Sequence, residues 1–297
     1  MLGTVTLTRR NEVSIHTYTS PEAGWLVNTH IIELPTQLLV VDAQYTLTFA
    51  REVIRYAETL EKPITRVYIS HYHPDHLLGA AAFSAPLYAL AEVTAKIDAV
   101  GDRVASEEHE KHPDTIPAHA QKPSQIVNPG LVTIDGLRLE FLRLQHAETE
   151  NALMIALPDQ GILIAQDFLY HGVHVFLGEC AFDTWIDMLQ EFKMLPYDLL
   201  LAGHGAPGGS EIYDEMIRYL SFAKEALAKS SSGDDLKERL IAAFPNLGGR
   251  VLLDHQRRFL FPTHRGDVQS WTDRRKPFDL RDVCQPAREG KERDLSR

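Results

Sequence analysis

Four side chains of types that bind metals fall within six positions of the sequence: His71, His73, Asp75 and His76. They directly follow residues 64–70, an apolar and β-branched run that is typical of a buried strand. Along an extended segment residues i and i+2 point the same way, so His71 and His73 can hold one ion together. Pro74 bends the chain, and Asp75 and His76 beyond it can face a second ion. The spacing predicts a metal site rather than an ordinary polar turn.

Three more residues of strong ligand types follow predicted strands. His146 comes after residues 137–144, Asp167 comes after residues 161–166, and His204 comes after residues 198–202. Open α/β folds gather their functional loops at the carboxyl ends of their strands. Three ligand-type residues at the ends of strands, added to the first cluster, indicate a common site rather than a chance placement.

The pattern HYHPDHLLG, from His71 to Gly79, followed by His146, Asp167 and His204, resembles that of the metallo-β-lactamase superfamily of hydrolases. It matches the family motif H-x-H-x-D-H-x-x-G at every position, and the resemblance covers about residues 13 to 210. The resemblance implies an α/β fold, a four-layer αββα sandwich, with the metals at one edge of two facing sheets.

The resemblance also implies the ligand sets. It assigns His71, His73 and His146 to a first metal, Asp75, His76 and His204 to a second, and Asp167 to a bridge between them. Nitrogen and oxygen ligands without cysteine suit two Zn²⁺ ions best, although Fe or Mn is compatible. Two ions share a water and lower its pKa, which makes hydroxide available at neutral pH. Asp75 is in addition a candidate proton shuttle.

Two features narrow the subfamily. Asp167 stands where common β-lactamases have a cysteine, as it does in lactonases, thioesterases, phosphodiesterases and nucleases of the superfamily, and also in mononuclear iron sulfur dioxygenases. The stretch HAETEN, from His146 to Asn151, is bulkier and more acidic than the family's usual small segment. We expect Glu148 within it to orient a ligand histidine from outside the metal shell.

The run from Asp167 to Glu179 leaves the bridging position and offers two donors, Tyr170 and His174. Either can steady an oxyanion, and the apolar neighbours predict a pocket for a hydrophobic acyl or ring group. We therefore expect a dinuclear zinc hydrolase of small esters, with lactones first. Thioesters, β-lactams, phosphodiester or nuclease substrates and the mononuclear iron chemistry are the alternatives.

Composition favours a small-molecule substrate. The 297 residues carry a formal net charge of −11, which argues against nucleic acid because phosphate binding relies on a basic surface. No run approaches the roughly 18 apolar residues that a membrane span needs, and the start lacks the pattern of a secretory signal. With two cysteines, Cys180 and Cys284, the chain is typical of a cytoplasmic enzyme.

The elements that must position these residues alternate between strands and helices. Strands are expected at 4–7, 13–17, 24–33, 37–42, 64–70, 86–89, 131–134, 137–144, 152–157, 161–166 and 198–202. Helices are expected at 48–60, 77–83, 91–99, 182–195, 211–229 and 234–244, and a surface loop or lid at 101–122.

The predicted domains are a catalytic domain at 1–210, C-terminal helices at 211–250 and a partly irregular tail at 251–297. An apolar stripe on the first C-terminal helix is expected to pack on the sandwich, and this region or the tail also offers a surface for a homodimer.

Overall fold

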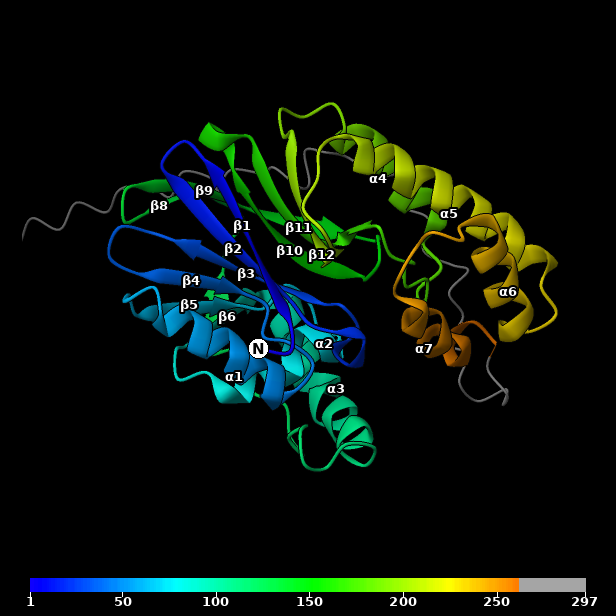
Figure 1. Cartoon of the computed structure of the whole chain (residues 1–297), viewed down its shortest axis with the longest axis horizontal. Coiled ribbons are helices and arrows are strands. Elements are labelled where there is room, and N and C mark those ends of the chain that lie inside the picture. The colour runs from blue at the N-terminus through cyan, green and yellow to red at the C-terminus, as the bar shows by residue number, and fades with distance from the viewer. Residues whose placement is uncertain (262–297) are drawn as a thin grey trace, which may run out of the picture.

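The computed structural model describes residues 1–261, so most of the predicted tail lies outside the described residues. Two β-sheets face each other in the middle of the molecule, and helices cover the outer side of each (Figure 1). Helices α1 to α3 lie on the side of the first sheet, and α4 and α5 lie on the side of the second. This is the predicted αββα arrangement, and the C-terminal helical extension is present as well.

The first sheet has seven strands in the order in which they occur along the chain. Strands β1 to β4 are antiparallel, whereas β4 to β7 are parallel, with helices in the connections between them. The strands are β1 (Thr4–Arg10), β2 (Val13–Thr19), β3 (Asn28–Glu33), β4 (Leu38–Val41), β5 (Ile64–Tyr68), β6 (Leu87–Leu90) and β7 (Gln125–Val127).

The second sheet has five strands in the order β12-β11-β10-β9-β8. Its strands are antiparallel except for the parallel pair β11 and β12, which are joined through helix α4. The strands are β8 (Gly130–Ile134), β9 (Leu137–Gln145), β10 (Asn151–Leu157), β11 (Ile162–His171) and β12 (Leu199–Gly205).

The helices form where apolar residues recur at helical spacing. In α1 (Leu47–Glu58), Phe49, Ala50 and Val53 are buried, and the Thr46 hydroxyl caps the first turn by accepting from the Phe49 N–H. In α4 (Phe182–Phe192) the buried face carries Trp185, Met188, Leu189 and Phe192. These faces close the two hydrophobic cores. The first joins the first sheet and its helices to side chains of the second sheet, and the second lies between the second sheet, helix α4 and the C-terminal helices.

Two side chains of β3 cross between the sheets and tie the first to β12 of the second. Asn28 Nδ2 donates to the carbonyls of Ala202 and Gly205 at 2.9 and 2.7 Å, and His30 Nε2 donates to the Ala202 carbonyl at 3.1 Å. Asn28 and His30 are both fully buried. The bonds hold β12, which carries His204, against β3 in the antiparallel half of the first sheet.

The C-terminal extension consists of α5 (Glu211–Lys229), α6 (Gly233–Ala243) and α7 (Arg250–Leu260). The predicted stripe on α5 packs inside the chain, because Ile212, Met216, Leu220 and Ala223 are at most 2% exposed. None of the helices in residues 1–261 combines the length and apolar character that crossing a bilayer requires.

Two expectations about elements are wrong. Residues 101–109 belong to α3 (Ala91–His109) and not to a surface loop, because their polar side chains line the exposed face of a helix whose other face is buried. The start of the predicted tail at 251–297 is helical, since residues 250–260 form α7. The helix predicted at 77–83 is the short α2 (Pro74–Leu77), followed by a 3₁₀ turn over Leu78–Ala82.

Candidate metal centre

The loop after β5 carries four of the predicted ligands. The strand ends at Tyr68, His73 keeps an extended backbone (φ −63°, ψ 148°), and Pro74 starts α2. Proline suits the first helical position because its φ is already helical and its nitrogen needs no hydrogen-bond partner. The bend buries the side chains of His71, Asp75 and His76, which are at most 4% exposed.

Hydrogen bonds on the outward-facing ring nitrogens orient the histidines. The Nδ1–H of His76 donates to Asp42 Oδ2 at 2.6 Å, and the Nδ1–H of His204 donates to the Trp25 carbonyl at 2.9 Å. A partner of this kind fixes the tautomer and presents the other nitrogen to a metal. Nε2 of both rings therefore points into the centre, where it is buried and makes no hydrogen bond.

Asp42, which the sequence analysis did not single out, is the buried acceptor behind the centre. It accepts from the backbone N–H of Ser70 at 2.7 Å and from the Ser70 hydroxyl at 2.6 Å, and Gln166 Nε2 also donates to it. The same hydroxyl accepts from His71 Nδ1 at 2.8 Å, so the network also sets this ring. The only sequence signal for Asp42 is an acidic residue directly after a buried strand.

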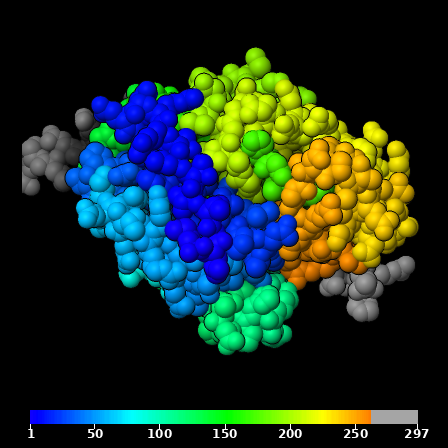
Figure 2. Space-filling view, viewed as in Figure 1, coloured from blue at the N-terminus to red at the C-terminus, as the bar shows by residue number. Residues whose placement is uncertain are grey.

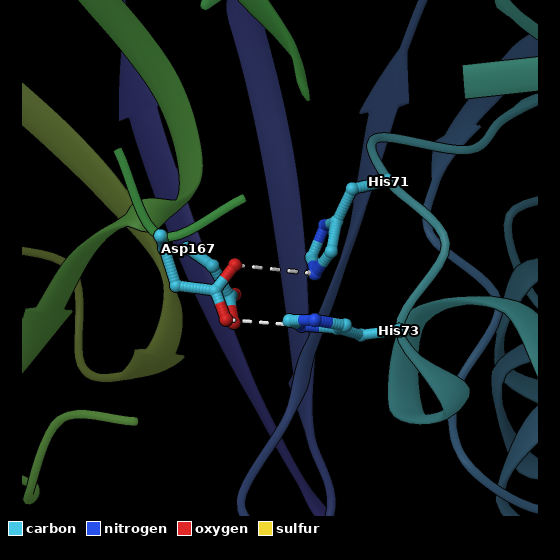
Figure 3. Close-up of side chains that lie close together, drawn as sticks. His71, His73 and Asp167 are labelled. Atoms are coloured by element: carbon cyan, nitrogen blue, oxygen red, sulfur yellow. Dashed lines mark ion pairs between the residues drawn. The ribbon is translucent and has the colours of Figure 1, made fainter. Parts of the chain in front are cut away.

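The structure brings six of the seven predicted ligands together. Among residues 1–261, three groups have ligand atoms that all lie within 4.8 Å of one another. Two consist of predicted ligands, with Glu148 completing the first: His71, His73, Glu148 and Asp167 in one, Asp75, His76 and His204 in the other. The third is Asp42 with His71 and His76. Asp167 also lies beside the second group, with Oδ1 3.0 Å from His76 Nε2 and Oδ2 3.3 Å from His204 Nε2. Figure 3 shows the Asp167 carboxylate facing His71 and His73 from the opposite sheet.

The position of Asp167 depends on a local irregularity and on a glycine. The pairing of β11 with β12 shifts register on both sides of Gln166, whose backbone is left-handed (φ 46°), and such a bulge redirects the next side chain. On β12, a Cβ at Gly203 would lie 1.9 Å from Asp167 Oδ1. Only glycine leaves room there for the carboxylate.

Glu148 stands where His146 was expected. Glu148 is 4% exposed, with Oε1 3.0 Å from His73 Nδ1 and Oε2 3.7 Å from His71 Nε2. The His146 ring belongs to neither ligand group among the described residues. A tight turn explains the exchange: the His146 N–H donates to the Glu150 carbonyl at 3.1 Å, and the His146 carbonyl accepts from the Thr184 hydroxyl at 2.7 Å. Glu148 is thus a ligand candidate itself rather than a support for one.

The two expected substrate-side donors lie in different places. The Tyr170 hydroxyl donates to Asp167 Oδ2 at 2.6 Å, and its ring stacks on His204 with centroids 4.9 Å apart. Tyr170 therefore borders the centre. His174 is fully buried in the second core, where its Nδ1 lies 3.0 Å from the Tyr219 hydroxyl, and it does not line the cavity described below.

Burial and neighbouring charges shift the pKa values of the ionisable residues in the centre. Burial is the largest single influence on the pKa of Asp75 and Asp167 and would raise both, but His76 and His204 together outweigh it and hold both pKa values well below their usual range. Burial raises the pKa of Glu148 to about 7, and the Glu148 carboxylate overcomes burial to raise the pKa of His73 to about 8. The centre therefore concentrates ionisable groups in a largely buried space.

The donor set fits a metal ion. Buried atoms without a hydrogen bond are costly, and five of them converge here: Nε2 of His71, His76 and His204, Glu148 Oε1 and Asp167 Oδ1. His76 Nε2 lies 3.0 Å from Asp167 Oδ1 yet makes no hydrogen bond with it. A cation between such atoms would satisfy them all, and imidazole with carboxylate suits Zn²⁺ and similar divalent ions.

A cavity of about 490 Å³ opens directly beside the centre. Its inner wall contains His73, Asp75, Glu148, Asp167, Tyr170 and His204, and its outer walls come from the loop at Trp25 and from helices α3 and α7. A substrate in this cavity would meet the ligand groups at its inner end.

The sequence matches the model of a known family over more than half of its length. Residues 23–204 match the metallo-beta-lactamase superfamily. A linear primary-alkylsulfatase from Pseudomonas sp. (strain ATCC 19151) is 23% identical over 229 residues, which cover 63% of this chain and 43% of that protein. The matched region thus spans less than half the length of that relative.

Solved structures share the fold. A metallo-beta-lactamase from Pontibacter korlensis matches with a TM-score of 0.55 at 18% identity, over 73% of this chain and 99% of that chain. The metallo-beta-lactamase FIM-1 from Pseudomonas aeruginosa, in a mono-zinc form, matches with a TM-score of 0.54 at 19% identity, over 74% of this chain and 96% of that chain.

Proposed function

The chain belongs to the metallo-beta-lactamase superfamily of metal-dependent hydrolases, and from this premise we propose that it hydrolyses small esters, with lactones preferred. The observation that carries the proposal is that buried donor atoms without hydrogen-bond partners converge around Asp167. Such a convergence is costly to maintain unless the atoms bind ions. The cavity beside them gives a small molecule access to the same place.

Two ions, Zn²⁺ in this proposal, have distinct ligand groups. His71, His73 and Glu148 would hold the first, and Asp75, His76 and His204 the second, with Asp167 shared between them. His146 is left out because its ring joins neither group. When bound, two such ions lower the pKa of water to about 7 and polarise the bond to be cleaved.

Residues of the chain have complementary proton roles. Asp75 is ionised, because His76 and His204 together outweigh the effect of burial on its pKa, and it can take up the proton that hydrolysis releases. Tyr170 keeps its proton, because burial and the nearby Asp167 raise the pKa of its hydroxyl well above the usual value. That hydroxyl borders the cavity and is our candidate donor to the oxyanion of an attacked ester carbonyl, to which it would turn from Asp167.

A carboxylic ester suits this arrangement because one donor beside the centre serves one oxyanion. A phosphodiester would call for several unpaired cations. The two arginines that line the cavity, Arg103 and Arg258, each have a glutamate partner, at 2.8 and 3.5 Å respectively. These pairs support acyl substrates over phosphodiesters.

A sulfate ester is the second candidate. The specific observation in its favour is the relative named as a linear primary-alkylsulfatase, which matches 63% of this chain. An apolar chain attached to a sulfate group would use the same cavity, with the sulfate at the metal centre.

The test is a substrate panel on zinc-loaded protein: alkyl γ-lactones, thioesters, a β-lactam, linear alkyl sulfates and a phosphodiester. We expect lactones to give a kcat/KM at least about tenfold above the others. Faster turnover of alkyl sulfates would replace the lactone by the sulfate ester. Faster turnover of the phosphodiester would overturn the ester proposal altogether.

A further inference from the structure

Helix α7 forms an outer wall of the cavity although it lies beyond residues 23–204, which match the family model. Four of its residues line the cavity: Leu252, His255, Arg258 and Phe259. Figure 2 shows α7, in orange, packed against the blue N-terminal part of the molecule. The opposite outer wall comes from α3, through Arg103, Val104, Glu107 and Glu108.

Aromatic contacts hold α7 at the cavity. The His255 ring lies 4.2 Å from the Trp25 ring, centroid to centroid, and Phe259 meets Phe176 edge-on at 5.6 Å. Trp25 also accepts the hydrogen bond from His204 through its carbonyl, so one residue contacts both α7 and a candidate ligand. Through Trp25, the wall formed by α7 is therefore in contact with the metal centre.

An ion pair joins α7 to α3 across the mouth of the cavity. Arg258 Nη2 lies 3.5 Å from Glu108 Oε1, and the Tyr45 hydroxyl donates to Glu108 Oε2 at 2.7 Å. Glu108 is 2% exposed, which makes this carboxylate a fixed anchor rather than a solvated charge. The two helices thus enclose the outer part of the cavity together.

Among the described residues, the arginines that line the outer cavity are both paired, so neither is available to bind a second anionic group of a substrate. Arg103 is paired with Glu107 at 2.8 Å, and Arg258 is paired with Glu108. Apart from these pairs, Glu179 and His255, the outer lining is mostly apolar or aromatic: Trp25, Tyr72, Val104, Phe176, Leu252 and Phe259. Such a wall favours an uncharged hydrophobic group.

The volume leaves room for such a group. Pockets for drug-sized ligands measure about 300–1,000 Å³, and this cavity of about 490 Å³ is far larger than an ester group alone. We propose that α3 and α7 form a specificity pocket for an apolar chain of the substrate, with the ester at the metal centre. The proposal rests on the ester hydrolase function and names its substrate class as hydrophobic esters.

The test measures binding separately from turnover. Calorimetry on zinc-loaded protein with linear alcohols from butanol to decanol should show affinity rising about fourfold per methylene until the pocket is full. Val104→Trp, which fills the pocket, should flatten this rise, and Phe259→Ala should reduce it. Phe222→Ala is the matched control, because Phe222 is a partly exposed phenylalanine of α5 outside the cavity.

The kinetic arm uses γ-lactones with alkyl side chains of increasing length. In Val104→Trp the loss of kcat/KM should grow with chain length, to at least about tenfold for the longest, while Phe222→Ala follows the unchanged protein. If affinity does not rise with chain length, or rises equally in Val104→Trp that circular dichroism shows to be folded, the specificity pocket is wrong. If Val104→Trp does not fold, the slope in Phe259→Ala decides in the same way.

The two proposals fail separately. Chain-length-dependent alcohol binding without hydrolysis of any ester on the panel would overturn the ester hydrolase and leave the apolar pocket. Lactone hydrolysis without any dependence on chain length in binding or kinetics would overturn the pocket and leave the hydrolase.

Discussion

One turn decides which side chain completes the first ligand group. Residues 146–150 close on themselves through the bond between the His146 N–H and the Glu150 carbonyl, and Glu148 is the side chain that reaches His73. The resemblance to the family assigns this place to His146, whereas the structure puts Glu148 there. The residue that points inward depends on the backbone of the turn and on a contact with Thr184, distant in sequence.

Substitution separates the two candidates. Glu148→Gln removes the charge of the carboxylate at nearly constant shape, so we expect it to lower metal content toward one ion per chain and turnover by at least about 10²-fold. His146→Gln should retain both metal content and turnover, and it is the matched control. Elemental analysis and steady-state kinetics measure these effects, and metal loss confined to His146→Gln would restore the original assignment.

Tyr170 and His174 looked alike in sequence, as two donors shortly after Asp167, and only the path of the chain after β11 separates them. Tyr170→Phe removes the hydroxyl beside Asp167, so we expect kcat on the best lactone to fall by about 10²–10³, with a smaller change in KM. His174→Ala should leave kcat within about threefold, since its ring contacts Tyr219 and not the cavity. Equal kcat for Tyr170→Phe and the unchanged protein would contradict the role of Tyr170.

At the scale of elements, the strands and the amphipathic helices follow from the sequence because their apolar periodicity is local. The length of α3 does not, since its second half reads as polar. There Arg103 and Glu107 pair along the exposed face, while Gly101 packs closely on Ile97 and Ala120 on the other. The sequence does not predict helix α7 for a similar reason. Its many charged residues obscure the helical spacing of the buried residues Leu252, Leu253 and Gln256.

The link between the sheets predicts a pH dependence of stability. Burial lowers the pKa of His30 in β3 to about 4, against about 6.5 when unfolded, so folding favours the neutral ring. The contribution of neutral His30 to the free energy of unfolding is complete above pH 6.5. As the pH falls toward 4, about 3 kcal/mol of this contribution is lost. In His30→Gln, denaturant unfolding should show a smaller loss over this range than in the unchanged protein. Identical losses in both would contradict this account of His30.

At the scale of the whole molecule, the sandwich follows from the resemblance, and the structure confirms it. The arrangement of the C-terminal helices around the cavity does not follow, since the contacts of Trp25 with His255 and of Glu108 with Arg258 join residues far apart in the chain. The homodimer stays a prediction, although the α5 stripe is already buried within one chain.

The central claim is that two ligand groups meet at Asp167 and hold two metal ions. Elemental analysis of purified protein, before and after zinc loading and dialysis, tests it most directly. We expect about two zinc ions per chain after loading, and about one in Asp167→Ala, because the shared carboxylate is lost while the rest of each group remains. No bound metal, or a single iron that zinc does not displace, would contradict the dinuclear centre and with it the proposed hydrolase.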